Sequence, residues 1–355
     1  MSPARQLLLW GSGPAHVQVL AHMARTPWAG AQVTLITPHT LHAVSSMLPG
    51  FVAGHTTWEE GVIPLEPLVR RSGIRWIQRN VRALDAQTHT VTLDDGSTLP
   101  YDWLSVNTGP IQDRAQVEAV MPGAREHALF LRPLEAFGTL WPQVLALGQS
   151  RALRVAVVGA ETTGIEVAMA VRNCLPNAAV TLLCGDAPPG VAYPAPVQAR
   201  IKAALQRRRI TVIQDSACGV RAGEVVLSRG ATLACDVPLL ATESSAPAWL
   251  QTSGLMLDER GQISVDAFQR SVSHAAVFVS TDGAGPALIP NLSATLAGQA
   301  PATQPSPASA LHLIDCGDSE AIASWGRYST QGRWVAWLKR RTDHRTMQNF
   351  LETTP

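Results

Sequence analysis

Two glycine-rich turns, about 150 residues apart, have the residue types and spacing that could do chemistry. The first is Gly11-Ser12-Gly13, which follows an apolar run at 7–10 and precedes apolar residues spaced by three to four. This pattern predicts a buried strand, a tight turn and a helix. Glycine suits the turn because a pyrophosphate must approach the backbone where a Cβ would collide, and the helix N-terminus then faces the anion. His16 stands where a third glycine or alanine is expected, so an ordinary strand-to-helix turn is the alternative.

The second turn, Gly159 to Gly164, repeats the pattern after the apolar run 153–158. Its middle glycine is replaced by Glu161, whose negative charge would repel a pyrophosphate. The sequence therefore leaves two interpretations open. The unit either binds a pyridine nucleotide or is a structural strand–helix–strand unit that has lost its nucleotide.

The residue that ends the second strand of each unit also departs from the pattern. A carboxylate at this position usually holds the ribose hydroxyls of a dinucleotide. Here the two positions are Thr37 and Cys184. A threonine hydroxyl makes one neutral hydrogen bond where a carboxylate accepts charge-assisted ones, so we expect the ribose contact at Thr37 to be weakened or supplied elsewhere.

The elements that must position these turns alternate short apolar strands with helices, which is typical of an α/β fold. The segment 39–50 is expected to be a loop at the carboxyl end of the sheet, where open α/β folds bind ligands. Asp282 ends a late apolar strand, and residues 299–309 form the clearest linker. The pattern predicts, in order, strand 7–10, helix 14–25, strand 31–37, an antiparallel meander over 81–99, strand 101–109, strand 153–158, strand 180–184, helix 196–209 and strand 271–282.

Composition excludes several classes of function. The 355 residues, 46% of them hydrophobic, can bury a core large enough for two domains. A net charge of +1 with 15% charged residues gives no electrostatic basis for nucleic acid as a partner. The five cysteines form no CxxC pair, which argues against a redox-active dithiol or a metal site and for a reducing compartment. Without a signal peptide or an apolar run of about 18 residues, the expectation is a soluble cytoplasmic protein.

Together these features resemble a known family, the flavoproteins with two dinucleotide-binding domains. Within it the chain is most similar to the type II NADH dehydrogenase-like pyridine nucleotide-disulfide oxidoreductases, in the subgroup associated with selenide, water dikinase. The resemblance spans nearly the whole chain. It is carried by the two fingerprints, Gly11 to Leu20, Ser46-Met-Leu-Pro-Gly50 with Ala53-Gly-His55, Val106-Asn-Thr-Gly109, Phe278-Val-Ser-Thr-Asp282, and the tail motif Ala321-Ile-Ala-Ser-Trp-Gly326 with Gly332-Arg-Trp334.

The resemblance implies an α/β fold with two dinucleotide-binding (Rossmann-like) domains, the second inserted in the first, plus a small C-terminal tail domain. The FAD-binding domain would comprise 1–113 and 265–300. The NAD(P)-binding-like domain would comprise 114–264, and the tail 301–355. Hydride would pass from NAD(P)H to FAD, and electrons would pass on to a small acceptor such as a quinone.

Particular residues take roles by this resemblance. The implied FAD contacts are Gly11, Gly13, Pro14, Ala15 and His16 at the pyrophosphate, Thr37 at the ribose, Met47, Leu48 and Pro49 near the flavin ring, Thr108 and Gly109 at the adenine half, and Asp282 at the ribityl chain or pyrophosphate. The implied NAD(P)H site contains Gly159, Gly164 and Glu166, with Glu166 near the nicotinamide as the catalytic residue. Plain structural alternatives are a strand end at Thr108-Gly109, a core plug at Met47-Leu48 and a solvated helix residue at Glu166.

Three departures from the family pattern support a second hypothesis. Thr281 replaces the glycine before Asp282, Glu161 disfavours the pyridine nucleotide, and the segment 283–290 is short compared with the family. The alternative to an enzyme is a degenerate flavoprotein fold. It would bind FAD weakly or not at all and act as a binding or regulatory partner.

The C-terminal tail carries a separate pattern. Trp334, Trp337 and Leu338 fall on one face of an expected helix, among Lys339, Arg340, Arg341 and Arg345. Aromatic and basic residues in this arrangement are typical of helices that lie at a membrane surface. The alternative is that the tryptophans pack on the flavin domain or on a second subunit of a homodimer.

Overall fold

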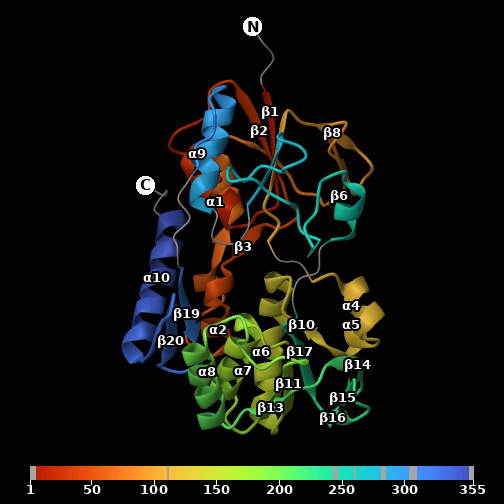
Figure 1. Ribbon diagram of the computed structural model, residues 1–355, viewed down its shortest axis with the longest axis vertical. Coiled ribbons are helices and arrows are strands. Elements are labelled where there is room, and N and C mark those ends of the chain that lie inside the picture. Colours follow the sequence, from red (N-terminus) through yellow and green to blue (C-terminus); the bar gives the residue numbers. More distant parts are fainter. Residues whose placement is uncertain are drawn as a thin grey trace.

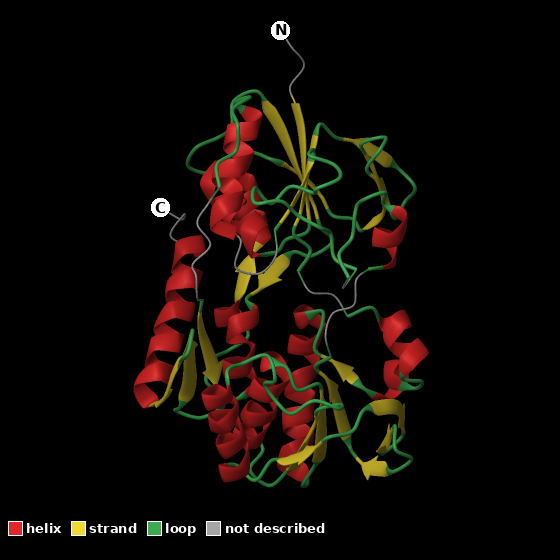
Figure 2. Ribbon diagram, in the orientation of Figure 1, coloured by secondary structure: helices red, strands yellow, loops and turns green. Residues whose placement is uncertain are grey.

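The computed structural model describes residues 5–109, 112–242, 247–259, 261–280, 285–303 and 310–351. Two lobes, each built on a parallel sheet, are stacked end to end, and a smaller antiparallel sheet with a long helix lies along their side (Figure 1). Helices flank both parallel sheets (Figure 2). This arrangement confirms the α/β fold class that the sequence predicts.

The first sheet has the strand order β18-β9-β1-β2-β5, all parallel. Its strands are β1 (Arg5–Trp10), β2 (Ala31–Ile36), β5 (Arg75–Ile77), β9 (Trp103–Val106) and β18 (Val277–Val279). Because β18 follows every strand of the second sheet in sequence, the second lobe is inserted within the first.

Alternate residues of β1 face different cores. Leu7 and Leu9 pack towards the helical face, and Leu8 and Trp10 pack towards the meander and a short 3-10 helix. The elements on the helical face are α1 (Pro14–Met23), α3 (Leu65–Ser72) and α9 (Gly285–Leu296). The elements on the other face are β6 (Val81–Asp85), β7 (Thr90–Leu93), β8 (Thr98–Pro100) and η3 (Ala248–Thr252).

The second sheet has the order β10-β17-β11-β12-β13, also parallel. Its strands are β10 (Leu129–Phe130), β11 (Arg154–Val158), β12 (Ala179–Leu183), β13 (Thr211–Ile213) and β17 (Val237–Leu240). One core contains residues of α6 (Leu134–Ser150), α7 (Thr162–Cys174) and α8 (Ala195–Arg207). The core on the other face contains residues of α4 (Arg114–Val120), α5 (Ala124–His127), β14 (Ala217–Arg221), β15 (Glu224–Leu227) and β16 (Thr232–Ala234).

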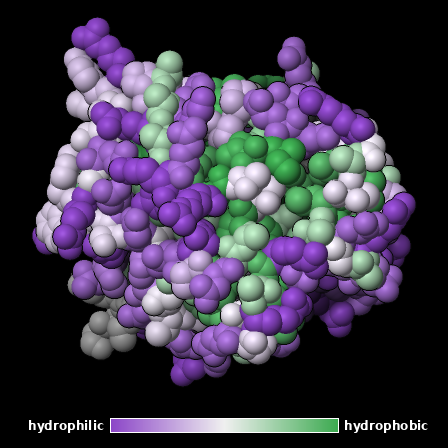
Figure 3. Space-filling model, turned by 90° about the horizontal axis from the view of Figure 1, so that it is seen from below, coloured by the Kyte–Doolittle hydropathy of each residue, from purple (hydrophilic) through white to green (hydrophobic). Residues whose placement is uncertain are grey.

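Seen from below, this lobe shows apolar side chains gathered within a polar surround (Figure 3). Exposed large apolar residues of the lobe include Leu140 and Leu147 of α6 and Val212 of β13. The second lobe therefore exposes some of its apolar side chains to solvent.

The third sheet packs against the second lobe, and the helix that follows it reaches the core of the first lobe. The strands of this sheet are β19 (Leu311–Asp315), β20 (Ala321–Trp325) and β21 (Tyr328–Gly332), followed by α10 (Arg333–Leu351). Ile314 and Ile322 enter the core that contains α7, whereas Ala323 packs with Val335 and Ala336 of α10 on the opposite face. The central strand β20 is thus buried on both faces.

The segment 39–50 differs from the expected loop. It contains β3 (Leu41–Ala43), which pairs with β4 (Val62–Pro64), then η1 (Ser45–Met47) and the start of α2 (Leu48–Val52), with η2 (Glu59–Gly61) before β4. Met47 is buried in the core of the first lobe, and Leu48 in the core of the second. These contacts with both lobes give the segment regular structure that its local sequence does not indicate.

Gly317 offers a test of how the third sheet is attached. Its φ is +77°, and a Cβ there would collide with the Met169 carbonyl of α7. We expect Gly317→Ala to cost about 3 kcal/mol in the free energy of unfolding by urea, since the backbones must separate. Gly298→Ala is the control, because Gly298 also has a positive φ (+72°) but nothing near the added Cβ, and should cost about 1 kcal/mol. Equal costs would contradict this account of the attachment.

Candidate functional site

A cavity of about 690 Å³ opens at the carboxyl edge of the first sheet, with walls from both lobes and from α10. Its volume is within the range of cofactor and ligand sites. The first lobe contributes the glycine turn, the ends of β1 and β2, and the β3 region. The lining residues are Trp10–Pro14, Ile36–His39, His42–Ser46, Asn80, Val81, Thr108, Gly109, Gln112, Arg132–Glu135, Pro247, Trp249, Thr346 and Phe350.

Close packing explains the two glycines of the first turn. Gly11 has a φ of +94°, and a Cβ there would lie 2.5 Å from the Asn107 carbonyl oxygen. A Cβ on Gly13 would collide with the Asn107 side chain. Glycine is therefore required at both positions by the approach of the turn to the end of β9, whether or not a ligand is bound.

Asn107 itself caps helix α1. Its Oδ1 accepts hydrogen bonds from the amides of Ala15 (3.0 Å) and His16 (3.3 Å), and its Nδ2 donates to the Ser280 carbonyl (2.8 Å). The side chain is only 2% exposed. The residue at the N-cap position, Gly13, has no side chain that could accept these hydrogen bonds. The cap of α1 is therefore supplied by Asn107, which follows β9.

His16 lies inside the fold, beneath the glycine turn. Its Nδ1 is 2.7 Å from the Gly11 carbonyl oxygen, and its Nε2 is 2.8 Å from Ser105 Oγ. The carbonyl can only accept, so Nδ1 carries the hydrogen and Nε2 accepts from the serine hydroxyl. Burial lowers the pKa of His16 to about 4 despite the bond to Gly11, and the ring is therefore neutral at pH 7.

The cavity wall around Ser12 is polar and largely neutral. His42 lines it and donates to the Ser12 carbonyl, while burial lowers the pKa of His42 to about 4. Thr37 Oγ1 donates to Ser12 Oγ at 3.3 Å, and Thr37 Oγ1 also accepts from the His39 amide at 3.3 Å. Arg132 and Glu135 supply the charged side chains of the lining.

The structure brings only some of the predicted residues to the cavity. Those that line it are Gly11, Gly13, Pro14, Thr37, Thr108 and Gly109. Those that the cavity lining does not include are Ala15, His16, Met47, Leu48 and Pro49, all of them buried. Asp282 and Thr281 lie outside the described residues, and the binding role of every one of these positions stays a prediction.

The second glycine turn lies away from this cavity, in the second lobe. A Cβ on Gly159, whose φ is +113°, would lie 2.5 Å from the Ala241 carbonyl oxygen, and one on Gly164 would collide with the Gly159 carbonyl. Glu161 occupies the N-cap position of α7. Tyr193 reaches the same helix end, with its hydroxyl 2.7 Å from Thr162 Oγ1.

Glu166 lies in a buried cluster of charges where α7, the third sheet and α10 meet. Its Oε1 accepts from the Asp315 amide at 2.7 Å, and burial raises the pKa of Glu166 to about 8 although Lys339 opposes the shift. Burial also raises the pKa of Asp315. Lys339 Nζ donates to Asp343 Oδ2 (3.0 Å) and to the Ser46 carbonyl (2.6 Å), and Ser46 lines the cavity. The predicted place of Glu166 beside a nicotinamide stays a prediction.

Sequence reasoning missed much of the cavity wall. Arg132–Glu135, Trp249 and Phe350 come from distant segments and belong to no motif. The Trp249 ring lies 4.1 Å from that of Trp10, which ends β1, so the two rings pack together beside the cavity. The lining residues His39 and His42–Ser46 did have a signal, because they fall in the segment 39–50 that was expected at the carboxyl edge of the sheet.

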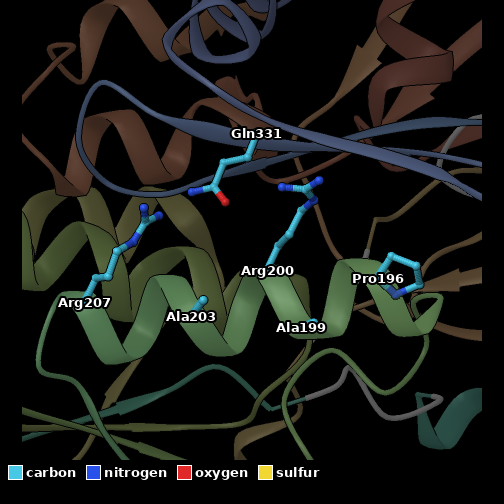
Figure 4. A pocket seen from close by; sticks show the side chains of 6 residues that line it. All are labelled: Pro196, Ala199, Arg200, Ala203, Arg207 and Gln331. Atoms are coloured by element: carbon cyan, nitrogen blue, oxygen red, sulfur yellow. The ribbon is translucent and has the colours of Figure 1, made fainter.

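A second, shallower pocket of about 400 Å³ lies between α8 and β21 (Figure 4). Alanines of α8 form its floor, and Arg200, Arg207 and Gln331 stand around it. Arg200 Nε donates to Ser329 Oγ at 3.2 Å, and Arg207 pairs with Glu320 at 3.2 Å. Both guanidinium groups thus already bind protein acceptors, so we place the candidate site in the larger cavity.

Comparison with known sequences finds one matching family. A family model described as pyridine nucleotide-disulphide oxidoreductase matches residues 5–301. The sulfide-quinone reductase of Aquifex aeolicus is 26% identical over 107 residues, which cover 30% of this chain and 25% of that protein. The ferredoxin–NAD(+) reductase component of the p-cumate 2,3-dioxygenase system of Pseudomonas putida is 41% identical over 103 residues, covering 29% and 23%. Each match thus spans about a quarter of the curated relative.

Solved structures resemble nearly the whole chain. The sulfide:quinone oxidoreductase of Aquifex aeolicus has a TM-score of 0.79 at 14% identity, covering 99% of this chain and 92% of its own. NDH2 of Plasmodium falciparum, solved in complex with NADH, has a TM-score of 0.72 at 12% identity, covering 99% and 98%. Putidaredoxin reductase in complex with putidaredoxin has a TM-score of 0.74 at 20% identity, covering 91% and 81%. At sequence identities this low, the structural similarity shows that the folds are alike and shows nothing about function.

Because His16 is neutral in the folded protein, we expect the stability of the fold to depend on pH. His16 has a folded pKa of about 4, below the ordinary value of 6.5, so its contribution to stability is present above pH 6.5 and is lost as the pH falls towards 4. In His16→Gln, an amide can bridge Gly11 and Ser105 without titrating. We expect the free energy of unfolding by urea of the wild type, relative to that of the variant, to fall by about 2 kcal/mol from about pH 7.5 to pH 5. A difference that stays constant with pH would contradict the prediction.

Proposed function

The chain belongs to the pyridine nucleotide-disulphide oxidoreductase family, and from this premise we propose that it is an FAD-dependent oxidoreductase that takes hydride from NAD(P)H and passes electrons to a small acceptor such as a quinone. The observation that carries the proposal is the cavity of about 690 Å³ beside the first glycine turn. Ligands of open α/β sheets bind at this carboxyl edge. Residues 1–113 with 265–300 would hold FAD, and 114–264 would hold the reductant.

The residues at the cavity fit FAD in size and chemistry. Gly11 and Gly13 line the cavity without side chains, and the hydroxyls of Ser12 and Thr37 lie beside them. Arg132 brings positive charge to the lining, which suits a phosphate-bearing ligand. When bound, FAD would supply the two-electron chemistry that side chains alone do not provide.

The remaining chemistry falls to the chain itself. The neutral His42 fixes the Ser12 carbonyl and so orients the turn. Glu166 holds a proton on its carboxyl group at neutral pH, because burial raises its pKa to about 8. Lys339 connects the Glu166 cluster to the cavity wall through the Ser46 carbonyl. We place Glu166 as a proton-holding residue behind that wall.

No dithiol takes part in the proposed route. All five cysteines are free, and none of them lines the cavity. Burial raises the pKa of Cys184 and Cys235 to about 11, and that of Cys174 and Cys316 to about 12, so these four thiols are poor nucleophiles at neutral pH. Electrons would therefore pass from flavin to acceptor without a disulfide.

The second candidate function is a degenerate flavoprotein that acts as a binding or regulatory partner. Two observations in the second lobe favour it. Glu161 places a carboxylate at the start of α7, and the bond between Tyr193 and Thr162 covers the same helix end. Both features oppose a pyridine nucleotide pyrophosphate at this turn. The link to selenide, water dikinase stays a prediction from the resemblance.

The absorption spectrum distinguishes the two functions. We expect protein incubated with FAD and passed through a desalting column to keep absorbance at about 450 nm, and anaerobic NADH or NADPH to bleach it. Ser12→Glu should lose the flavin, since it puts a carboxylate where the pyrophosphate would lie. Gln32→Glu adds the same charge on an exposed position of β2 and should retain the flavin. Retained flavin that neither reductant bleaches would favour the second candidate, and no retained flavin in the wild type would refute the enzyme.

Within the same proposal, α10 lies against an anionic membrane surface. No helix in the described ranges is long and apolar enough to cross a bilayer. Trp334 and Trp337 are 57% and 56% exposed, and the Arg341 guanidinium lies 5.4 Å from the centre of the Trp337 ring. The other exposed cations of the helix are Arg333, Arg340 and Arg345. Its single carboxylate, Asp343, is paired with Lys339, so the exposed face carries only positive charge.

A vesicle flotation assay tests the membrane contact. We expect the chain to float with vesicles that contain phosphatidylglycerol and to float less with phosphatidylcholine alone, because the face is cationic. The double variant Trp334→Ala, Trp337→Ala should lose most of the binding. Leu140→Ala with Leu147→Ala, which removes exposed apolar side chains from α6, should keep it. Equal flotation of both double variants would refute the contact and leave packing against a second subunit as the alternative.

A further inference from the structure

The backbone amides of the first glycine turn are almost all engaged within the protein. The Gly11 amide donates to the Ile36 carbonyl (2.9 Å), and the Gly13 amide donates to the Asn107 carbonyl (2.8 Å). Pro14 has no N–H, and the amides of Ala15 and His16 both donate to Asn107 Oδ1. Of this turn, only the Ser12 amide has no partner among the residues that the structure describes.

The two amides held by Asn107 are the ones that an anion would use. They lie in the first turn of α1, where unpaired N–H groups and the helix dipole favour negative charge. A phosphate oxygen is a stronger acceptor than a neutral carboxamide oxygen, so it can displace Asn107 Oδ1, but only if the carboxamide moves away. Asn107 is also fixed from its other side by the Ser280 carbonyl.

We propose that the Asn107 carboxamide competes with the FAD pyrophosphate for the Ala15 and His16 amides, so that Asn107 sets the affinity of the chain for FAD. The inference rests on the proposed function. Within the described ranges, the His16 ring is committed to Gly11 and Ser105 and Gly13 has no side chain, so neither of these neighbours takes over the cap. Gly13 and Pro14 line the cavity, and Asn107, Ala15 and His16 lie behind them, so removing the carboxamide frees both amides next to the cavity wall.

Titration of the full chain, freed of bound flavin, tests this competition. In Asn107→Ala we expect the dissociation constant for FAD, measured by quenching of flavin fluorescence, to fall about tenfold or more. The gain should be confined to the pyrophosphate, so the affinity for riboflavin should not rise. Asn291→Ala is the matched control, because Asn291 is also a buried asparagine of the first lobe and donates to a backbone carbonyl, that of Phe268. It should leave FAD affinity unchanged.

Each outcome of this titration supports or overturns the proposal. Unchanged or weaker FAD binding in Asn107→Ala, or an equal gain for riboflavin, overturns it. Thermal unfolding of the flavin-free variants shows that they fold, and if Asn107→Ala does not fold, Asn107→Ser takes its place in the same comparison. If neither the wild type nor any variant binds FAD, the proposed function fails. Equal FAD affinity in all of them overturns only the role of Asn107.

Discussion

The close approach of the Gly11–Gly13 turn to Asn107 is the constraint on which the first lobe depends. Asn107 connects three segments: it accepts from the turn and from the start of α1, and it donates to the Ser280 carbonyl after β18. The absence of a Cβ on either glycine allows this contact. A glycine fingerprint can therefore persist for packing reasons alone, and its presence does not by itself show that a nucleotide binds.

The sequence predicts the fold better than the site. Apolar runs followed by glycine turns predict parallel strands, because few other structures satisfy both patterns, and β1, β2, β11 and β12 form as expected. The prediction of a loop at 39–50 was wrong, although the segment does line the cavity at the carboxyl edge. Its regular structure depends on tertiary contacts, because β3 pairs with β4 and residues 47 and 48 pack into different cores. Arg132–Glu135, Trp249 and Phe350 reach the cavity through tertiary packing, which local sequence does not encode.

The buried charges around Lys339 connect the cavity to the rest of the molecule. Lys339 meets Asp343 and lies near Glu166 and Asp315, so three acidic side chains surround one ammonium group. Although burial lowers the pKa of Lys339, these acidic groups outweigh it and the pKa is raised. The lysine thus stays charged, while burial favours the protonated form of Glu166. The charged Lys339 holds α10 against the cavity wall through its hydrogen bond to the Ser46 carbonyl. A hydrophobic contact would not fix the orientation of α10 as specifically.

The two glycine turns differ in what stands in the way of a phosphate. At the first turn the obstacle is the neutral side chain of Asn107, which can rotate away if its hydrogen bonds are replaced by those of a better acceptor. At the second turn the obstacle includes the charge of Glu161, and moving a charged side chain near the ligand does not remove its repulsion. Rearrangement alone therefore opens the first turn, whereas the second also needs a compensating cation. We accordingly expect FAD to bind more tightly than the pyridine nucleotide.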